Sequence, residues 1–161
     1  MKNIVLVGMP GCGKTTIGRM LAVNLGRLFV DCDNALAEAA GISIPEIFER
    51  EGEQGFRLRE TQALKEIGAQ SGLVIATGGG CVTREENHAI LKENGIIIFI
   101  ERDLSLLARE GRPLSAGDLE AMYRHRLPLY RHFADLTIQN SESAEIAAQK
   151  ALEALSKVSA I

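Results

Sequence analysis

The feature that most constrains the fold is a glycine-rich segment, "GMPGCGKTT" at residues 8–16, which directly follows the apolar run at residues 3–7. Its first eight residues match the phosphate-loop pattern G-x-x-x-x-G-K-[ST]. Glycines let backbone N–H groups surround an oxyanion, and a following helix adds the positive end of its dipole. The sequence therefore predicts a buried strand at residues 3–7 and a helix from Lys14 to about Leu25.

Two side chains of this segment have the chemistry that a nucleoside triphosphate needs. Lys14 would reach the β- and γ-phosphates as a point charge. The Thr15 hydroxyl would supply an oxygen ligand for Mg²⁺. The side chain of Cys12 is interpreted as non-catalytic, with only its backbone used in the loop, because no histidine lies nearby in the sequence to activate a thiol. A dinucleotide site is less favoured, since Thr16 stands where that fingerprint has Gly or Ala.

Strand-like apolar runs alternate with helical patterns along the chain, without repeats, low-complexity stretches or a long linker. We expect one domain over residues 1–161. Short strands separated by helices pair in parallel through right-handed crossovers. The predicted class is α/β, with a five-stranded parallel sheet in a three-layer α/β/α arrangement. Strands are expected at residues 3–7, 28–33, from 73 into the glycine loop at 78–80, 95–101 and 134–139.

Several helices have sequence signals at their ends. The pattern that starts at Ser43 resembles a capping box and predicts a helix that begins near Ile44. The pattern that starts at Thr83 also resembles a capping box and predicts a helix that ends at about Glu93. Asp103 is expected to cap a short helix. An amphipathic stretch covers about residues 52–70, and alanines and leucines at helical spacing predict a C-terminal helix.

Ligands of parallel α/β sheets bind beyond the carboxyl ends of the strands. Asp31 and Asp33 lie there, and if both were on a strand their carboxylates would share a face. One would hold Mg²⁺ through water and the other would accept or orient a hydroxyl proton. Three consecutive glycines, at residues 78–80, suggest close approach of the backbone to a ligand.

A third candidate cluster is Arg57 with Glu60, three residues apart on a predicted helix. An arginine oriented by a glutamate suits a carboxylate ligand. Taken separately, each cluster also has an interpretation without function. Arg57 and Glu60 could be a surface ion pair, the acids at 31–33 could be loop and helix-cap residues, and the glycines at 78–80 could form a flexible turn.

A phosphate loop is shared by kinases, switch GTPases and ATP-driven motor or regulatory proteins. The GTPase strings N-K-x-D and D-x-x-G do not occur, and 161 residues are few for most motor ATPases. A small kinase is therefore the favoured class. No lysine occurs between Lys92 and Lys150, and the arginines there suit transition-state charge on a phosphoryl group.

Charge and cysteine content restrict the partners. The net charge of −3 argues against general nucleic-acid binding. Three cysteines without metal-ligand spacing indicate reduced thiols and a cytoplasmic location. The apolar run at residues 4–7 is too short for a secretory signal or a membrane span. A monomer is expected, because no spare apolar face stands out.

Taken in order, six segments resemble shikimate kinases over nearly the whole chain: "GMPGCGKTT", "DCD", "SIPEIFEREGEQGFRLRE", "TGGG", "GRPLS" and "RLPLYRHFAD". The resemblance implies the P-loop fold of the nucleoside-monophosphate-kinase type. It also implies a substrate-binding insertion at about residues 32–60 and a lid at about 108–117, which is shorter here than in many members.

The implied reaction is ATP-dependent phosphorylation of the 3-hydroxyl of shikimate, which gives shikimate 3-phosphate and ADP on the route to chorismate and aromatic amino acids. The implied catalytic residues are Lys14, Asp33 and Arg112. The implied ATP-binding residues are Gly11, Cys12, Gly13, Lys14, Thr15, Thr16 and Arg112. Mg²⁺ is the implied cofactor, with Thr15 and Asp31 at the metal. The implied shikimate-binding residues are Asp33, Arg57, Glu60, Gly78, Gly79, Gly80 and Arg126.

The resemblance also implies individual roles. Arg57 and Arg126 would take the carboxylate of shikimate, and Glu60 would orient Arg57. Asp33 would activate the accepting hydroxyl, and Phe48 and Phe56 would pack beside the ring. Arg112 would move in with the lid.

Two other functions stay open at this point. One is a related kinase for another polyol acid such as gluconate, because paired arginines would serve that carboxylate too. The other is a nucleotide-binding module without catalysis, against which the intact set of Lys14, Thr15, Asp33 and Arg112 argues.

Overall fold

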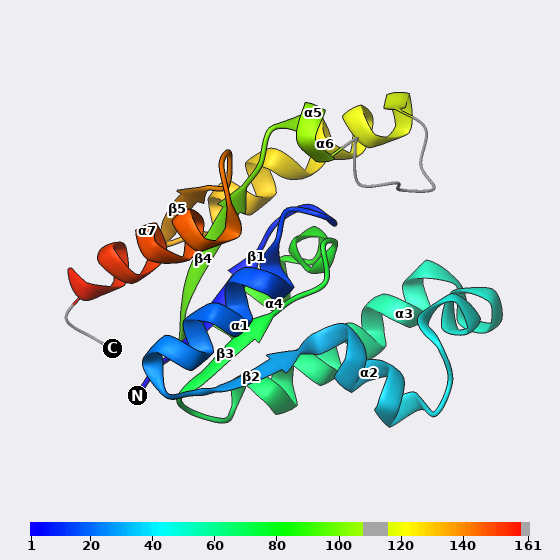
Figure 1. Ribbon diagram of the computed structural model, residues 1–161. Coiled ribbons are helices and arrows are strands. Elements are labelled where there is room, and N and C mark those ends of the chain that lie inside the picture. Colours follow the sequence, from blue (N-terminus) through cyan, green and yellow to red (C-terminus); the bar gives the residue numbers. More distant parts are fainter. Residues whose placement is uncertain (108–115, 159–161) are drawn as a thin grey trace.

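A five-stranded parallel sheet organises the structure, a computed structural model that describes residues 1–107 and 116–158 (Figure 1). The strand order across the sheet is β2-β3-β1-β4-β5. The strands are β1 (Asn3–Val7), β2 (Leu28–Asp31), β3 (Leu73–Ala76), β4 (Gly95–Glu101) and β5 (Leu136–Gln139). The first strand lies at the centre, so the loop that follows it opens at the middle of the carboxyl edge.

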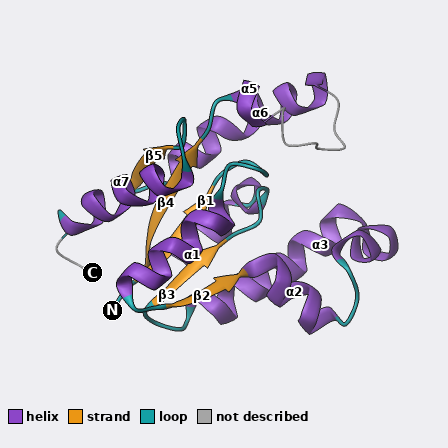
Figure 2. Ribbon diagram, in the orientation of Figure 1, coloured by secondary structure: helices purple, strands orange, loops and turns teal. Residues whose placement is uncertain are grey.

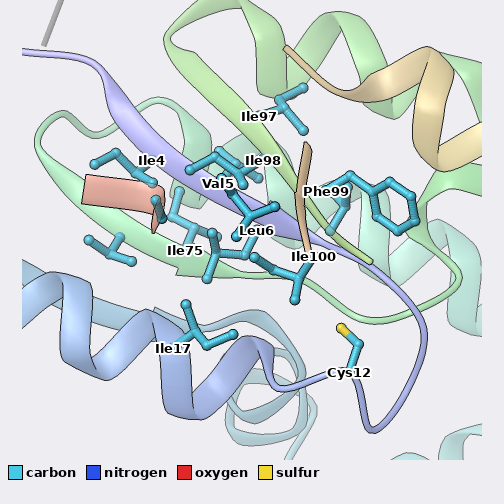
Figure 3. Packing of buried hydrophobic residues seen from close by; sticks show 14 of the residues in the cluster. Ile4, Val5, Leu6, Cys12, Ile17, Ile75, Ile97, Ile98, Phe99 and Ile100 are labelled. Carbon is cyan, nitrogen blue, oxygen red and sulfur yellow. The ribbon is translucent and has the colours of Figure 1, made fainter. Parts of the chain in front are cut away.

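Continuous apolar character of the central strands reflects burial on both faces. Val5 of β1 is in register with Ile75 of β3 on one side and with Ile97 of β4 on the other. All three side chains are at most 1% exposed. Figure 3 shows how residues of these strands pack together, with Ile17 approaching from the first helix and Cys12 from the glycine-rich loop.

Helices cover both faces of the sheet (Figure 2). The first and last helices pack on each other over one face, and the C-terminal part of α3 lies with α4 and α6 on the other. The three-layer α/β prediction is therefore confirmed. The helices are α1 (Lys14–Leu25), α2 (Cys32–Ala40), α3 (Ile44–Gly68), α4 (Glu85–Glu93), α5 (Leu104–Leu107), α6 (Ala116–Phe133) and α7 (Ala144–Ser156), with a 3₁₀ turn, η1 (Cys81–Thr83).

Beyond the β2 edge, α2 and α3 pack on each other around a small apolar cluster of Leu36, Ile47 and Phe56. The helix α3 is kinked at Gly52, where φ is 73°. A side chain at this left-handed backbone position would be strained, which explains a glycine there. The kink turns the second half of α3 toward the sheet.

Several local predictions are confirmed. The first helix spans Lys14–Leu25 as expected. The Ser43 side chain accepts a hydrogen bond from the Glu46 N–H and caps α3. The Asp103 Oδ1 accepts hydrogen bonds from the backbone N–H and the hydroxyl of Ser105 at the start of α5.

The prediction that Asp31 and Asp33 lie on one strand is wrong. The strand β2 ends at Asp31, whose side chain accepts hydrogen bonds from the backbone N–H groups of Asp33 and Asn34. This cap starts α2 at Cys32. Because these two orphan N–H groups find a partner in Asp31, a helix outcompetes further strand pairing.

The capping box predicted at Thr83 is also wrong. The Thr83 hydroxyl donates to the carbonyl oxygen of Gly80 and closes the η1 turn. The following helix begins at Glu85, and Arg84 makes no side-chain cap. The last strand is shorter than expected, since the Ala134 N–H still bonds to the Tyr130 carbonyl at the end of α6.

Within residues 1–107 and 116–158, no helix combines the length and the apolar character needed to cross a bilayer.

Candidate active site

The glycine-rich loop connects β1 to α1 through backbone positions that favour glycine. Gly13 caps α1 with a φ of 105°, in the left-handed region. At Gly8, an added Cβ would lie 2.7 Å from the carbonyl oxygen of Ile100. The loop therefore depends on bare backbone at both ends.

Lys14 lies inside this loop and is only 9% exposed. Its Nζ donates to the carbonyl oxygens of Gly8 at 2.6 Å and Met9 at 3.0 Å. Its remaining contact is with the Cys12 sulfur at 3.8 Å, a weak acceptor that a stronger one can replace. The ammonium group is thus held in place with donor capacity still available for an anion. The side chains of Thr15 and Thr16 are exposed in the first turn of α1.

A residue that the sequence analysis missed supports the loop from the segment that follows β5, at the same carboxyl edge of the sheet. Asn140 is buried, and its Nδ2 donates to the carbonyl oxygen of Cys12 at 2.8 Å. Its own backbone N–H bonds to the Glu101 carbonyl at the end of β4. The partner lies 128 positions away, so the sequence holds no local signal for this contact.

Asp33 lies in the first turn of α2, between the loop and a cluster of arginines. The pKa of its carboxyl is raised, first because burial disfavours the charge and second because of the neighbouring Asp31. The charges of Lys14 and Arg57 act in the opposite direction. Asp33 therefore sits where the fields of the phosphate loop and of Arg57 overlap.

Arg57 and Glu60 form a buried ion pair rather than a surface one. The Arg57 Nη1 donates to the Glu60 Oε1 at 3.0 Å, with side-chain exposures of 12% and 2%. Burial raises the pKa of Glu60, and Arg57 partly offsets this shift. Among the described residues, the Nε of Arg57 and the Oε2 of Glu60 have no hydrogen-bond partner. Buried polar atoms in proteins usually have a hydrogen-bond partner, so these two atoms call for one that a bound ligand or a water would supply.

Aromatic rings flank the arginine. The guanidinium of Arg57 lies 5.1 Å from the centre of the Phe56 ring. Phe56 in turn stacks on Phe48, with ring centres 4.6 Å apart. The pair gives this side of the site an apolar wall.

Close contacts with neighbouring side chains explain why the loop after β3 contains glycines. A Cβ on Gly78 would lie 2.8 Å from the Asp33 Oδ1 and 2.9 Å from the Glu60 Oε2. A Cβ on Gly79 would lie 2.7 Å from the Cδ of Pro10. The backbone of this loop therefore lies close to side chains of the protein itself, whereas the sequence suggested close approach to a ligand.

A second missed residue, Tyr130 on α6, connects this loop to Arg126. Its hydroxyl donates to the carbonyl oxygen of Gly79 at 2.5 Å, and the side chain is 1% exposed. Burial raises the pKa of the phenol, so it stays a donor. Arg126 lies four residues earlier, on the same helical face. That spacing within "RLPLY" is a signal that could have singled out Tyr130.

These side chains meet in one pocket of about 220 Å³. Drug-sized ligands occupy about 300–1,000 Å³, so this pocket suits a small metabolite. It is lined by Asp33, Phe48, Phe56, Arg57, Glu60, Arg126 and the glycine loop at residues 78–80. Arg112, which was expected to act from the lid, lies outside the described residues, as does most of the lid expected at residues 108–117.

Gly80→Ala is expected to weaken binding of the pocket's ligand. The backbone of Gly80 has a φ of −99°, which alanine adopts freely, but the new Cβ would overlap the guanidinium of Arg57. The arginine must then shift, and we expect the KM of the pocket's ligand to rise about 10-fold or more. Gly68→Ala is the matched control, because its Cβ would make only ordinary contacts. An unchanged KM in Gly80→Ala would contradict this account of Arg57.

Comparison with known proteins gives consistent matches. A family model described as shikimate kinase matches residues 10–156. A shikimate kinase of Bordetella avium is 47% identical over 146 residues, which cover 84% of this chain and 70% of the relative. A shikimate kinase of Neisseria meningitidis serogroup C is 40% identical over 159 residues, covering 90% and 94%.

Solved structures agree with the sequence matches. A shikimate kinase from Acinetobacter baumannii in complex with shikimate has a TM-score of 0.92 and 39% identity, with 100% of this chain and 96% of that chain covered. A gluconokinase from Sinorhizobium meliloti has a TM-score of 0.65 at 17% identity, covering 98% and 93%. The second likeness extends to the fold only.

Proposed function

Because the chain belongs to the shikimate kinase family and phosphorylates shikimate with ATP, we propose specific roles for the residues of its site. The observation that carries the proposal is the pocket in which Asp33, Arg57 and Arg126 converge beside the phosphate loop. It offers two cations for a carboxylate and the Asp33 carboxylate for hydroxyls, since the Glu60 carboxylate is paired with Arg57. This set is the complement of a polyhydroxy acid. The reaction serves the shikimate pathway of aromatic amino-acid biosynthesis.

In this proposal, Arg57 and Arg126 bind the substrate carboxylate. The buried Glu60 holds one side of the Arg57 fork through the 3.0 Å contact. The exposed Glu53 lies 3.5 Å from the other terminal nitrogen, Nη2, and the substrate carboxylate would compete with this weaker, exposed partner. A guanidinium that is already oriented loses less entropy on binding. The rings of Phe48 and Phe56 contact the carbon ring, and the backbone of Gly78, Gly79 and Gly80 completes the wall.

Asp33 is proposed to orient the accepting 3-hydroxyl. Its carboxyl is influenced by the charges of both Lys14 and Arg57, and it lines the same pocket as Pro10 of the phosphate loop and Arg57, which supports this role. An ionised carboxylate can accept the hydroxyl proton as the oxygen attacks the γ-phosphorus. The shikimate carboxylate fixed at the arginines would hold the ring in the orientation that this step requires.

The phosphate loop is proposed to bind the ATP phosphates. The backbone N–H groups of residues 11–16 would bind the phosphate oxygens: Gly11, Cys12, Gly13, Lys14, Thr15 and Thr16. Lys14 would neutralise charge that develops on the transferred group. Arg112 would add a second positive charge from the lid.

The residues near the loop fit a magnesium ion. Thr15 offers an exposed hydroxyl in the first turn of α1. Asp31 uses its Oδ1 for the α2 cap, which leaves Oδ2 for further bonding. These are the oxygen donors that Mg²⁺ prefers, with waters and phosphates as the other ligands. When bound with ATP, the ion supplies charge neutralisation for the phosphates.

Residues 1–161 are proposed to form one domain, with residues 32–60 as its substrate-binding insertion and 108–117 as its lid. Three free cysteines support a cytoplasmic location. A monomer is also proposed. Among the described residues, the exposed large apolar side chains come from five segments of the chain: Met1, Val23, Leu28, Phe48, Leu58 and Ile146.

The acid limb of the pH profile is expected to lie above pH 3.8, the ordinary pKa of an aspartate. Asp33 must be ionised to accept a proton, so kcat/KM falls as the pH drops through its raised pKa. Asp31→Asn keeps a good helix cap but removes one cause of that shift, so the acid limb should move to lower pH. Because Asp31 is also a proposed Mg²⁺ ligand, kcat/KM for shikimate is measured at saturating MgATP. The measurement is the pH dependence of kcat/KM for the wild type and for Asp31→Asn. An acid limb at the same pH in both enzymes would contradict the assignment of that limb to Asp33.

The proposed function is tested by ADP release with MgATP and either shikimate, quinate, gluconate or no acceptor. ADP release that requires shikimate would support the pocket assignment. Release with gluconate or quinate instead would overturn the acceptor pocket while leaving the phosphate loop intact. Nucleotide binding without turnover on any acceptor would favour a binding module.

A further inference from the structure

Two of the three histidines of the chain meet a glutamate away from the substrate pocket. Glu85 and His88 project from α4, three residues apart, and His132 comes from the last turn of α6. The Glu85 Oε1 lies 2.9 Å from the His132 Nε2 and 3.7 Å from the His88 Nδ1. The three donor atoms lie within 4.8 Å of one another.

From this convergence, we infer that Glu85, His88 and His132 form a surface site for a divalent transition-metal ion such as Zn²⁺. Zinc binds imidazole nitrogen and carboxylate oxygen at about 2.0–2.2 Å in tetrahedral geometry, so neighbouring donor atoms lie about 3.3 Å apart. The two measured distances from Glu85 lie on either side of that value. The third distance, between the two imidazole nitrogens, is at most 4.8 Å, and coordination would require rotation of the partly exposed side chains to shorten it.

The ligand set selects the kind of ion. Two imidazoles with one carboxylate suit zinc, copper and nickel, whereas Mg²⁺ prefers an all-oxygen shell. Water would complete the coordination. The site is therefore chemically distinct from the proposed magnesium position at Thr15 and Asp31.

Packing already restricts one of the three ligands. The His88 ring lies 4.8 Å from the rings of both Phe133 and His132. Phe133 is buried, so it gives the His88 ring a fixed neighbour. A restricted ligand loses less side-chain entropy when it coordinates a metal.

A bound ion would connect α4 to the C-terminal end of α6. The same helix carries Arg126, which lines the pocket, and Tyr130, which bonds to Gly79 of the pocket wall; both lie within two turns before His132. Metal binding should therefore stabilise the folded protein and reduce motion of α6 against the sheet. At a free zinc concentration ten times Kd, linkage predicts a rise in Tm of about 3–6 °C.

The test is calorimetric titration of the nucleotide-free protein with Zn²⁺, together with thermal melts with and without zinc. We expect one zinc per chain and a higher Tm, both unaffected by millimolar Mg²⁺. His132→Asn and Glu85→Gln should each weaken binding at least 10-fold. His125→Asn is the matched control, because His125 is exposed on α6 outside the cluster.

Absence of zinc binding to the wild type would overturn the inference, and so would equal binding by wild type, His132→Asn and Glu85→Gln. Circular dichroism verifies that each variant is folded, and Glu85→Gln preserves side-chain shape if a histidine variant is unstable. Kinase activity does not enter this test, so a failure here leaves the proposed roles of the substrate pocket untouched.

Discussion

Lys14→Ala is expected to lower kcat for shikimate phosphorylation about 10²- to 10³-fold or more, which is the cost of removing one preorganised charge-stabilising donor. The ammonium group is anchored by two carbonyl oxygens, at 2.6 and 3.0 Å, so it costs little reorganisation when negative charge develops on the phosphoryl group. Steady-state kinetics with saturating MgATP and shikimate measure the effect.

The same substitution has a structural cost that must be separated from catalysis. Two carbonyl oxygens in a buried loop lose their donor, at about 1–3 kcal/mol for each group left unpaired. Urea unfolding measures that loss. Lys150→Ala is the control, because it removes the same charge from an exposed position on α7. A folded Lys14→Ala enzyme with kcat within tenfold of the wild type would refute the proposed role.

Arg57→Ala is expected to raise the KM for shikimate about 30-fold to several thousand-fold, with a smaller change in kcat. Losing one partner of a buried, hydrogen-bonded charge pair costs about 2–5 kcal/mol. Here the substrate carboxylate loses a guanidinium in a site where Arg57 is 12% exposed, and Glu60 loses its partner as well. The KM for ATP should change little, because the phosphate loop is intact.

Arg59→Ala is the matched control for this variant. Arg59 comes from the same helix two residues later and pairs with Glu51 on the exposed side, at 2.8 Å. Exposed pairs contribute about 0–1 kcal/mol, so its kinetics should match the wild type. Arg57→Lys should restore charge without the planar fork and recover only part of the affinity. If the shikimate KM were unchanged in Arg57→Ala, the carboxylate would bind elsewhere.

Features set by a few adjacent residues could be predicted from the sequence. The phosphate loop and the start of α1 at Lys14 follow from glycines, a lysine and a preceding apolar strand. The caps at Ser43 and Asp103 follow from side chains that bond to N–H groups two or three residues away. Such contacts need no long-range packing, so their signals are local.

Choices between two local alternatives were less predictable. Alternation placed Asp31 and Asp33 on a strand, but Asp31 bonds to two N–H groups and starts a helix instead. Thr83 fits a capping box in the sequence, yet its hydroxyl bonds backward to Gly80. In both cases two local hydrogen-bonding arrangements are possible, and they differ little in free energy. The surrounding packing therefore decides which one forms.

The sequence by itself determined the kind of fold, the phosphate loop and the family resemblance, because these depend on residue type, order and spacing. Only the tertiary structure decided that the Arg57–Glu60 pair is buried, that Asn140 supports Cys12, and that Tyr130 bonds to Gly79. The contacts of Asn140 and Tyr130 join residues 128 and 51 positions apart. The physical reason is that burial and long-range hydrogen bonds arise only once the sheet has brought distant elements together.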